Sequence, residues 1–352
     1  MRVGILQEAI CPSGTTWEQR YLEVIDEAIL ADKLGYDFYG FSEQHFSFYN
    51  ATISAPEVFL GAVAGLTEQI RLRWMSAVLL GFNHPIRVLE QLATLDLISG
   101  GRAELGGARS NNRPTLDAFG IDPTTTRAQR DEFLSVIGKA FTQKQFSHDG
   151  PTWHIGETTI TPKSIQQPHP PLYLSATGKD SHANAGKMGL GVMTGFSILG
   201  WEYVEDCLAS YRYEVARADP IAAHVNESAG VASLVVNCAD TKEEAYEAAT
   251  EMAFRFIDSM LDMYGDISKR STDYAYLGQI ESIRDRARDL DYLIDCSPYY
   301  TIGTPDFFLE RFGRLSELGY DEVILRIDGM GHEANMAAIK SIGQHVLPEL
   351  NR

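Results

Sequence analysis

The chain has 352 residues, which suits two ordinary domains or one α/β barrel of about 250 to 400 residues. Hydrophobic residues make up 44% and charged residues 22%, which excludes a disordered chain, and the net charge of −18 disfavours nucleic acid and anionic membranes as partners. No apolar run reaches the about 18 residues of a membrane span, and Glu8 interrupts the start of the chain where a signal peptide would be apolar. We therefore expect a cytoplasmic protein.

The first half of the chain alternates short β-branched runs with stretches of helical period, a pattern typical of βαβ units. Leu22, Ile25 and Ile29 recur at helical spacing and should form the buried face of a helix over 21–34 that stops at Gly35. The expected strands are 3–6, 38–42, 70–79 and 102–106, and further helices should begin at Pro56 and at His84-Pro85.

The second half repeats this alternation. Strands are expected at 172–176, 190–194, 231–236 and 322–327, with helices at 127–141, 180–188, 201–215, 242–264, 305–318 and 334–346. Eight strands with intervening helices predict a single (β/α)8 TIM barrel domain over 1–352.

Two stretches do not fit an ideal barrel and are predicted to be insertions. Residues 146–171 could form a hairpin within 153–160, and 265–303 mixes Gly, Ser, Asp and Tyr. A loop as long as 265–303 is usually a lid or a binding segment rather than a connector, so we expect a lid there.

The active site of a barrel lies at the carboxyl ends of its strands. The second strand ends in Ser42-Glu43-Gln44-His45-Phe46, and strand periodicity predicts Glu43 and His45 on one side and Gln44 on the other. His45 is a candidate general acid or base, with Glu43 beside it; the alternative is a hydrogen-bonded loop histidine. The nearby Phe46, Phe48, Tyr49 and Phe82 could contact an apolar ligand or could be core residues.

Two further strand ends suggest an anion site. Arg109 follows two glycines at the end of the fourth strand and offers a planar fork for phosphate. Thr177, Gly178 and Ser181 follow the fifth strand at the start of a helix, where free N–H groups meet an anion. The alternatives are a surface salt bridge for Arg109 and a plain helix cap for the second segment.

The sequence lacks the motifs of several other catalytic and binding chemistries. The sequence has no H-E-x-x-H or similar cluster of metal ligands, no dinucleotide fingerprint, no nucleophile elbow and no Walker loop. We therefore expect no metal site. Four scattered cysteines without a C-x-x-C pair indicate neither a disulfide framework nor a zinc site: Cys11, Cys207, Cys238 and Cys296.

The chain resembles the bacterial-luciferase-like, flavin-dependent monooxygenases over nearly its whole length. The most specific block is 70–109, with His84-Pro85-Ile86-Arg87, the segment 90–96 and Ser99-Gly100-Gly101-Arg102 in order. Glu43-Gln44-His45-Phe46 and the pattern at 302–305 and 319–320 are also similar to family elements.

The resemblance implies a TIM barrel that binds FMN at its mouth, usually as a homodimer. Arg109 matches the arginine that holds the FMN phosphate, and 177–181 matches the other phosphate contacts. Ala108 stands where the luciferase α subunit has a reactive cysteine, and Gln44 replaces the histidine that luciferases use, so light emission is not expected. Ser76-Ala77 occupies the family's place for a cis peptide under the flavin ring, and we expect that bond to be cis.

The function implied by the resemblance is that of a two-component monooxygenase. A separate NAD(P)H:flavin reductase supplies reduced FMN (FMNH2), which activates O2 as a flavin C4a-peroxide and oxygenates a small apolar organic substrate. One alternative is a deazaflavin (F420)-dependent hydride-transfer oxidoreductase on the same barrel. A second is a flavin-binding protein without turnover.

Overall fold

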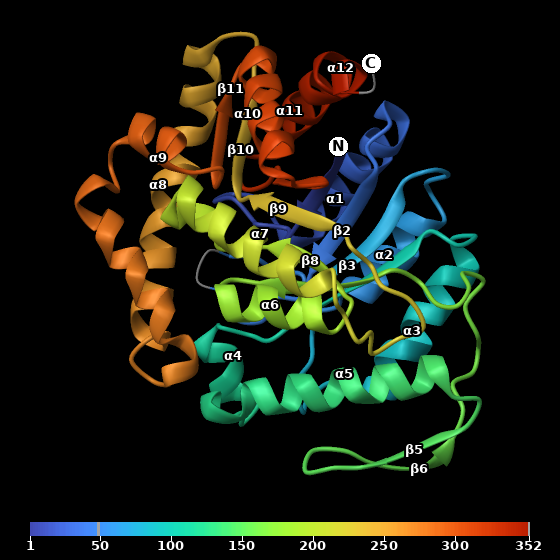
Figure 1. The fold of residues 1–352 in the computed structure, drawn as a ribbon. Coiled ribbons are helices and arrows are strands. Elements are labelled where there is room, and N and C mark those ends of the chain that lie inside the picture. Colours follow the sequence, from blue (N-terminus) through green and yellow to red (C-terminus); the bar gives the residue numbers. More distant parts are fainter. Residues whose placement is uncertain (48–49, 351–352) are drawn as a thin grey trace.

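The computed structural model describes residues 1–47 and 50–350, and its centre is a closed barrel of eight parallel strands (Figure 1). The order of the strands around the barrel is β1-β12-β9-β8-β7-β4-β3-β2. The eight strands are β1 (Arg2–Gln7), β2 (Phe38–Ser42), β3 (Arg71–Val78), β4 (Ala103–Ala108), β7 (Leu172–Ala176), β8 (Gly191–Thr194), β9 (Ala229–Ser233) and β12 (Glu322–Arg326). This architecture confirms the predicted TIM barrel.

Helices surround the barrel and connect successive strands. They are α1 (Trp17–Leu34), α2 (Pro56–Ala64), α3 (Pro85–Ile98), α4 (Arg113–Ala118), α5 (Thr126–Thr142), α6 (Lys179–Lys187), α7 (Trp201–Val215), α8 (Lys242–Ile267), α9 (Leu290–Cys296), α10 (Pro305–Leu318), α11 (His332–His345) and α12 (Leu347–Leu350). Short 3-10 segments are η1 (Pro123–Thr125), η2 (Ser197–Leu199) and η3 (Thr272–Arg286). Among the described residues, no helix is long and apolar enough to cross a membrane.

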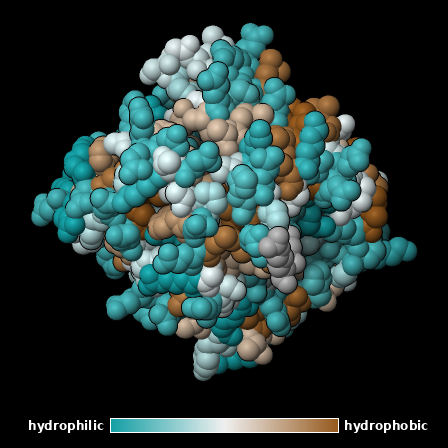
Figure 2. All heavy atoms as spheres, turned by 90° about the horizontal axis from the view of Figure 1, so that it is seen from above, coloured by the Kyte–Doolittle hydropathy of each residue, from teal (hydrophilic) through white to brown (hydrophobic). Residues whose placement is uncertain are grey.

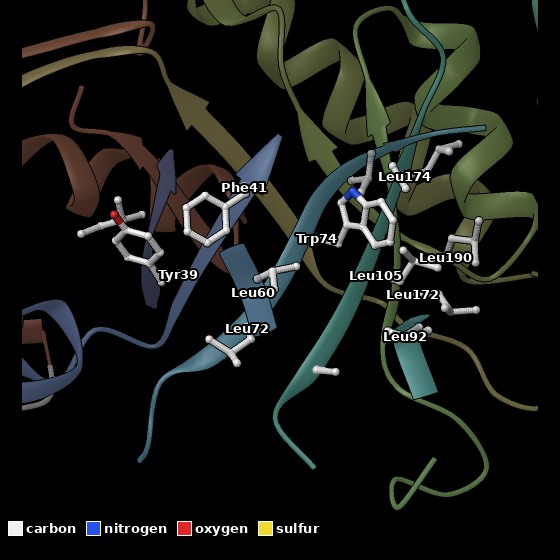
Figure 3. Close-up of a cluster of buried hydrophobic side chains, with 14 of the residues drawn as sticks. Tyr39, Phe41, Leu60, Leu72, Trp74, Leu92, Leu105, Leu172, Leu174 and Leu190 are labelled. Carbon is white, nitrogen blue, oxygen red and sulfur yellow. The ribbon is translucent and has the colours of Figure 1, made fainter. Parts of the chain in front are cut away.

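The main core lies between the outer face of the barrel and the helices. Alternate residues of the strands, such as Phe41 of β2 and Trp74 of β3, point outward there and pack near Leu60 of α2 and Leu92 of α3 (Figure 3). The inward face of α3 is formed by Val88, Leu89, Leu92 and Leu95, which are all buried. On the face shown in Figure 2, groups of hydrophobic residues (brown) lie between hydrophilic ones (teal).

The inside of the barrel is filled by layers of different chemistry. The middle layer is apolar and includes Leu6, Met75, Met193 and Ile324. Gly106 must be small here, because an added Cβ would lie 2.4 Å from the Met75 carbonyl oxygen. The layer at the amino ends of the strands is charged: the guanidinium of Arg73 lies between two aromatic rings and pairs with two buried carboxylates, those of Glu104 at 2.6 Å and Glu322 at 2.7 Å.

The predicted buried face of α1 is wrong. Leu22 is 61% exposed, and the buried residues of this helix are Arg20, Val24, Glu27, Ala28 and Ala31. Arg20 turns inward because its guanidinium donates to Glu27 at 2.8 Å and to Asp328 at 2.9 Å. A buried ion network therefore sets the rotation of α1, and a hydrophobicity pattern does not reveal such a network.

The predicted strand over 231–236 is two strands. The barrel strand β9 ends at Ser233, and β10 (Val235–Cys238) pairs in parallel with β11 (Tyr300–Gly303) in a separate sheet. The chain leaves the barrel because the backbone N–H groups of Leu234 and Val235 both donate to the carbonyl of Tyr299, at 2.8 and 3.2 Å. This partner is 65 residues away in sequence, so local pattern could not identify it.

Both insertions are more ordered than expected. The hairpin pairs β5 (Phe146–Asp149) with β6 (His154–Thr158), so it begins before 153 and projects from the barrel (Figure 1). The segment 265–303 is largely helical rather than a loop, because α8 continues through Gly265 and is followed by η3, α9 and β11. Gly265 is buried against η3, where an added Cβ would lie 3.0 Å from Glu281 Oε1, so this glycine serves close packing and does not end the helix.

Candidate active site

A cavity of about 630 Å³ opens at the carboxyl ends of the barrel strands. Its wall combines strand-end residues such as Glu43, Ser76 and Arg109 with Tyr274 and Tyr276 of η3. This volume lies within the range of about 300–1,000 Å³ that is usual for cofactor and ligand sites. The place predicted for the active site therefore coincides with a cavity.

One end of the cavity is cationic. Arg109 lines it and is mostly buried, with Nη1 3.3 Å from Thr126 Oγ1 and Nη2 donating to the Asp273 carbonyl at 3.0 Å. The Tyr274 ring lies under the guanidinium at 4.3 Å and its hydroxyl donates to the Ser110 carbonyl at 2.8 Å. Arg109 is thus held in one orientation by contacts on several sides.

The start of α6 lines the same cavity. Ser181 Oγ accepts hydrogen bonds from the backbone N–H groups of Thr177 and Gly178, both at 3.1 Å, and donates to the Gly178 carbonyl at 2.7 Å. The Thr177 hydroxyl contacts the Tyr276 hydroxyl, and the Tyr203 hydroxyl donates to the Thr177 carbonyl at 2.7 Å. The predicted residues Arg109, Thr177, Gly178 and Ser181 are therefore brought to one cavity.

A neutral histidine supports this loop from behind. His182 is fully buried, and burial lowers its pKa to about 4. Its Nδ1 lies 2.9 Å from the Gly178 carbonyl, which can only accept, so Nδ1 carries the proton and Nε2 accepts from the Thr194 hydroxyl at 2.9 Å. Burial likewise raises the pKa of Tyr203 and Tyr274, so these phenols remain hydrogen-bond donors.

Glu43 lies in the cavity wall at a well-defined position. Its Oε2 accepts from the Val78 N–H at 2.8 Å, and its Oε1 accepts from Asn83 Nδ2 at 2.9 Å and lies 3.0 Å from His45 Nε2. His45 is in contact with Glu43 as predicted, but it is not among the residues that line the cavity. Its ring instead packs edge-on against Phe82 and Phe119.

The predicted orientation of Gln44 is wrong. Gln44 lines the cavity and its Nε2 donates to Glu8 Oε1 at 2.7 Å, while Glu8 Oε2 accepts from Arg326 Nη1 at 2.9 Å. Strand periodicity does not apply here because β2 ends at Ser42. Sequence reasoning missed Glu8 and Arg326, although the end of the first strand and the end of the eighth were places where a barrel presents functional residues.

Ser76 and Ala108 line the cavity as expected, whereas the Ala77 side chain is buried in the outer core. The peptide bonds in cis among the described residues are Thr161–Pro162 and Gln167–Pro168, so Ser76–Ala77 is trans and the expected cis bond is wrong. The register between β3 and β4 shifts between Trp74 and Ala77 instead. A register shift of this kind redirects the end of the strand.

The apolar wall of the cavity comes from residues that the sequence did not single out. Phe46 and Phe82 do not line it, and Phe48 and Tyr49 lie outside the described residues. The lining apolar residues include Val78, Met193, Leu234, Phe256, Met260 and Met263. Three of them come from α8, far from the strand ends in sequence, and no motif marks them.

Comparison with known proteins places this fold and cavity in a family. The model of the luciferase-like monooxygenases matches residues 1–322. The chain therefore belongs to the luciferase-like monooxygenase family. Within that family it is of the flavin-dependent monooxygenase class, as the names of its relatives show.

Individual relatives agree with this class. The oxygenase component of a flavin-dependent trigonelline monooxygenase from Acinetobacter baylyi is 28% identical over 95% of this chain and 91% of that protein. An FMNH2-dependent dimethylsulfone monooxygenase from Pseudomonas putida is 26% identical over 95% and 88%. An uncharacterised protein, y4wF from Sinorhizobium fredii, is 32% identical, but the match covers only 51% of this chain and 52% of that protein.

Solved structures share the whole fold. Monooxygenase RslO1 from Streptomyces bottropensis superposes with a TM-score of 0.81 and 25% identity, covering 99% of this chain and all of that one. The oxygenating constituent of 3,6-diketocamphane monooxygenase from Pseudomonas putida, solved with FMN, gives a TM-score of 0.78 at 20% identity, covering 99% and 98%. An F420-dependent secondary alcohol dehydrogenase gives 0.76 at 15% identity, covering 99% and 98%, so the fold alone accommodates both cofactors.

Proposed function

We propose that this protein is the oxygenase of a two-component system that uses reduced FMN and O2 to oxygenate a small apolar organic substrate. The observation that carries this proposal is one cavity with a cationic end, formed by Arg109 and the start of α6, and an apolar wall. A ligand with a phosphate monoester attached to a flat ring system would match both the cationic end and the apolar wall of the cavity. The fit is supported by the buried Nε atom of Arg127 at the cationic end, which has no hydrogen-bond partner.

Several residues would hold the cofactor. Arg109, the N–H groups of Thr177 and Gly178, and the Ser181 hydroxyl would bind the phosphate, which would replace the hydrogen bonds that Ser181 Oγ makes with these two N–H groups. Ser76 and Ala108 line the cavity at the ends of β3 and β4 and would border the ring system. When bound, reduced FMN supplies the activation of O2, which side chains cannot perform.

The pair Glu43 and His45 would handle protons during the reaction. Glu43 lines the cavity, and its carboxylate lies 3.0 Å from His45 Nε2, within proton-transfer distance. The bonds from Val78 N–H and Asn83 fix the carboxylate, so a proton could pass between the cavity wall and the imidazole without side-chain movement. His45 acts through Glu43 in this scheme.

The residues of the cavity wall indicate the kind of substrate and the position of the lid. Methionine side chains adapt to irregular apolar shapes, and Met193, Met260 and Met263 all line the cavity, which favours an apolar substrate. Tyr274 and Tyr276 of η3 cover the cationic end and would exclude water from the reaction. We therefore propose that 265–303, and η3 in particular, acts as the lid.

We also propose two protein partners. A separate NAD(P)H:flavin reductase would supply reduced FMN, as the name of the trigonelline relative, an oxygenase component, suggests for that protein. A second copy of the chain would cover exposed apolar residues on the neighbouring helices α2 and α3: Val58, which is 66% exposed, Leu97 at 41% and Ile98 at 59%.

The test first compares the affinities for the two reduced cofactors and then looks for an oxygenated product. We expect dissociation constants for reduced FMN to be at least tenfold lower than those for reduced F420. With ¹⁸O2 and a panel of small aldehydes, ketones, aromatic compounds and terpenoids, one labelled oxygen atom should enter the product. Tight F420 binding with hydride transfer and no O2 uptake would contradict the proposal, and flavin binding without any labelled product would indicate a binding protein.

A further inference from the structure

Two methionines of α8 place thioether side chains in the wall of the cavity. Met260 and Met263 are three residues apart on the helix and both line the cavity, together with Phe256 and Tyr264 of the same helix. Only 2% of Met260 and 7% of Met263 is exposed, so bulk solvent scarcely reaches either side chain. What these two side chains meet is therefore decided by the contents of the cavity.

Two further methionines of the wall lie deeper in the barrel. Met75 and Met193 belong to the apolar layer between the strands. The sulfur of Met193 lies 3.9 Å from Arg73 Nη1, which donates to it from the charged layer. A donor at the sulfur engages a lone pair, and the lone pair is the part of a thioether that reacts with an oxidant. We therefore expect Met193 to react more slowly than the two methionines of α8.

The chemistry proposed for this site supplies an oxidant to that wall. When reduced FMN meets O2 without substrate, two electrons and two protons pass to O2, which leaves oxidised FMN and hydrogen peroxide. A thioether sulfur attacks hydrogen peroxide, the O–O bond breaks, one oxygen atom becomes the sulfoxide oxygen and the other leaves as water. Each sulfoxide therefore consumes one molecule of peroxide and needs no other reactant.

We propose that Met260 and Met263 form an oxidation site, where turnover without substrate converts the thioethers to methionine sulfoxide. This inference rests on the proposed function, because O2 activation is the source of the peroxide. A sulfoxide is polar and cannot pack like a thioether, so it spoils the wall that accepts an apolar substrate. Uncoupled turnover thereby lowers the affinity for substrate, and a methionine sulfoxide reductase restores it.

The chain contains reference methionines for a test. Met252 lies on the same helix and is only 3% exposed, but it does not line the cavity. Its sulfur accepts from Arg255 Nη2 at 3.4 Å within the helix, so its oxidation would report the opening of α8. Met188 and Met336 also lie outside the cavity and are partly exposed, so they report peroxide in the bulk solvent.

The experiment mixes the full chain, loaded with chemically reduced FMN, with ¹⁸O2-saturated buffer in the dark, with catalase and without substrate. Catalase destroys peroxide in the bulk solvent but is too large to enter the cavity. Peptide mass spectrometry should find ¹⁸O-labelled sulfoxide at Met260 and Met263 roughly tenfold above the level at the three reference methionines. Hydrogen peroxide added to the FMN-free protein should reverse this order, because the partly exposed Met188 and Met336 then react first.

A double variant tests the consequence for the protein. Met260→Leu with Met263→Leu keeps apolar side chains of similar volume that do not oxidise. Both methionines pack in a buried hydrophobic cluster, so repeated rounds of reduced FMN and O2 should lower the Tm of the parent protein by about 2 °C or more. The double variant should keep its own starting Tm, and Met252→Leu, the control, should behave like the parent protein.

The outcomes separate this inference from the proposed function. If reduced FMN binds and peroxide forms, but Met260 and Met263 carry no more label than the reference methionines, the oxidation site is wrong and the proposed function stands. Equal labelling of all these methionines that catalase abolishes would show that the oxidant comes from the bulk solvent, which also overturns the inference. Failure to bind reduced FMN would contradict the proposed function and remove the source of the peroxide with it.

Discussion

Arg109 is held by contacts on several sides, which could orient it toward a phosphate in the cavity. We expect Arg109→Ala to weaken FMN binding by about 2 kcal/mol or more, roughly thirtyfold in Kd, because a charge-assisted bidentate contact is lost. The measurement is flavin fluorescence titration at fixed ionic strength. The same substitution should leave riboflavin binding almost unchanged, since riboflavin carries no phosphate.

Two controls separate this effect from a packing defect. Arg109 also donates to the Asp273 carbonyl and lies over Tyr274, so its loss could disturb η3. Arg109→Lys keeps a charge without the planar fork and should show an intermediate affinity for FMN. FMN binding within twofold of the parent protein in Arg109→Ala would refute the phosphate role.

His45 provides a second prediction at the scale of a single residue. If it exchanges a proton with Glu43, His45→Ala should lower kcat by about 10²- to 10⁴-fold, the usual range for loss of a general acid or base, with little change in the Kd of FMN. The measurement is single-turnover kinetics at saturating substrate over a range of pH.

The substitution His45→Gln distinguishes proton transfer from positioning. Glutamine can still donate a hydrogen bond to Glu43 but does not titrate. A loss as large as that in His45→Ala, together with a flattened pH profile, supports proton exchange. A nearly normal rate in His45→Gln would show that His45 only orients Glu43, and normal rates in both variants would make it a packing residue against Phe82 and Phe119.

At the scale of elements, η3 is the part of the predicted lid that touches the site. Tyr274→Phe with Tyr276→Phe removes the hydroxyl contacts to Ser110, Thr126 and Thr177 while keeping both rings. We expect more hydrogen peroxide per product and faster tryptic cleavage at the exposed Lys269 and Arg270, because a loosened lid admits water and protease.

The measurements are the ratio of peroxide to product and limited trypsin digestion with and without FMN plus substrate. Ligands should slow cleavage in the parent protein. Tyr213→Phe on α7, where the side chain is 66% exposed, is the control. An unchanged peroxide ratio, with cleavage that ignores ligands, would show that η3 is an ordered spacer without a gating role.

At the scale of the whole molecule, the charged layer inside the barrel makes stability depend on pH. The guanidinium groups of Arg73, Arg2 and Arg71 outweigh burial and hold the pKa of Glu104 at about 2, below its ordinary value of 4.5. A carboxyl with a lowered folded-state pKa stabilises the fold fully above about pH 4.5, and this contribution is lost as pH falls from 4.5 toward 2.

Glu104→Gln should therefore lower the free energy of unfolding by about 3 kcal/mol near neutral pH, because Arg73 loses one of its two buried carboxylates. The difference from the parent protein should shrink below pH 4.5. Urea unfolding at several pH values measures this, with the exposed Glu68→Gln as control. A difference that is constant from pH 7 to 3 would indicate a packing defect and not the ionic layer.

The sequence by itself determined the barrel and most of its helices. Alternation of apolar strands with helices of 3.6-residue period is local, and so are the signals that end helices, such as Gly35 with φ 81° and Pro85 after the N-cap His84. The motifs around Arg109 and 177–181 identified one end of the cavity for the same reason. Each of these features depends on residues close together in the chain.

Only the tertiary structure decided the features that depend on distant partners. The rotation of α1 is set by the bond from Arg20 to Asp328, a residue 308 positions away in the chain. The end of β9 is set by the bonds from Leu234 and Val235 to the Tyr299 carbonyl. Asp273 meets Arg109 and Arg127 across three elements, and α8 supplies methionines to the cavity wall. Buried ion pairs and cavity walls form where separate segments of the chain meet. Their geometry is therefore fixed by tertiary packing, and the hydrophobic periodicity of a single segment does not predict it.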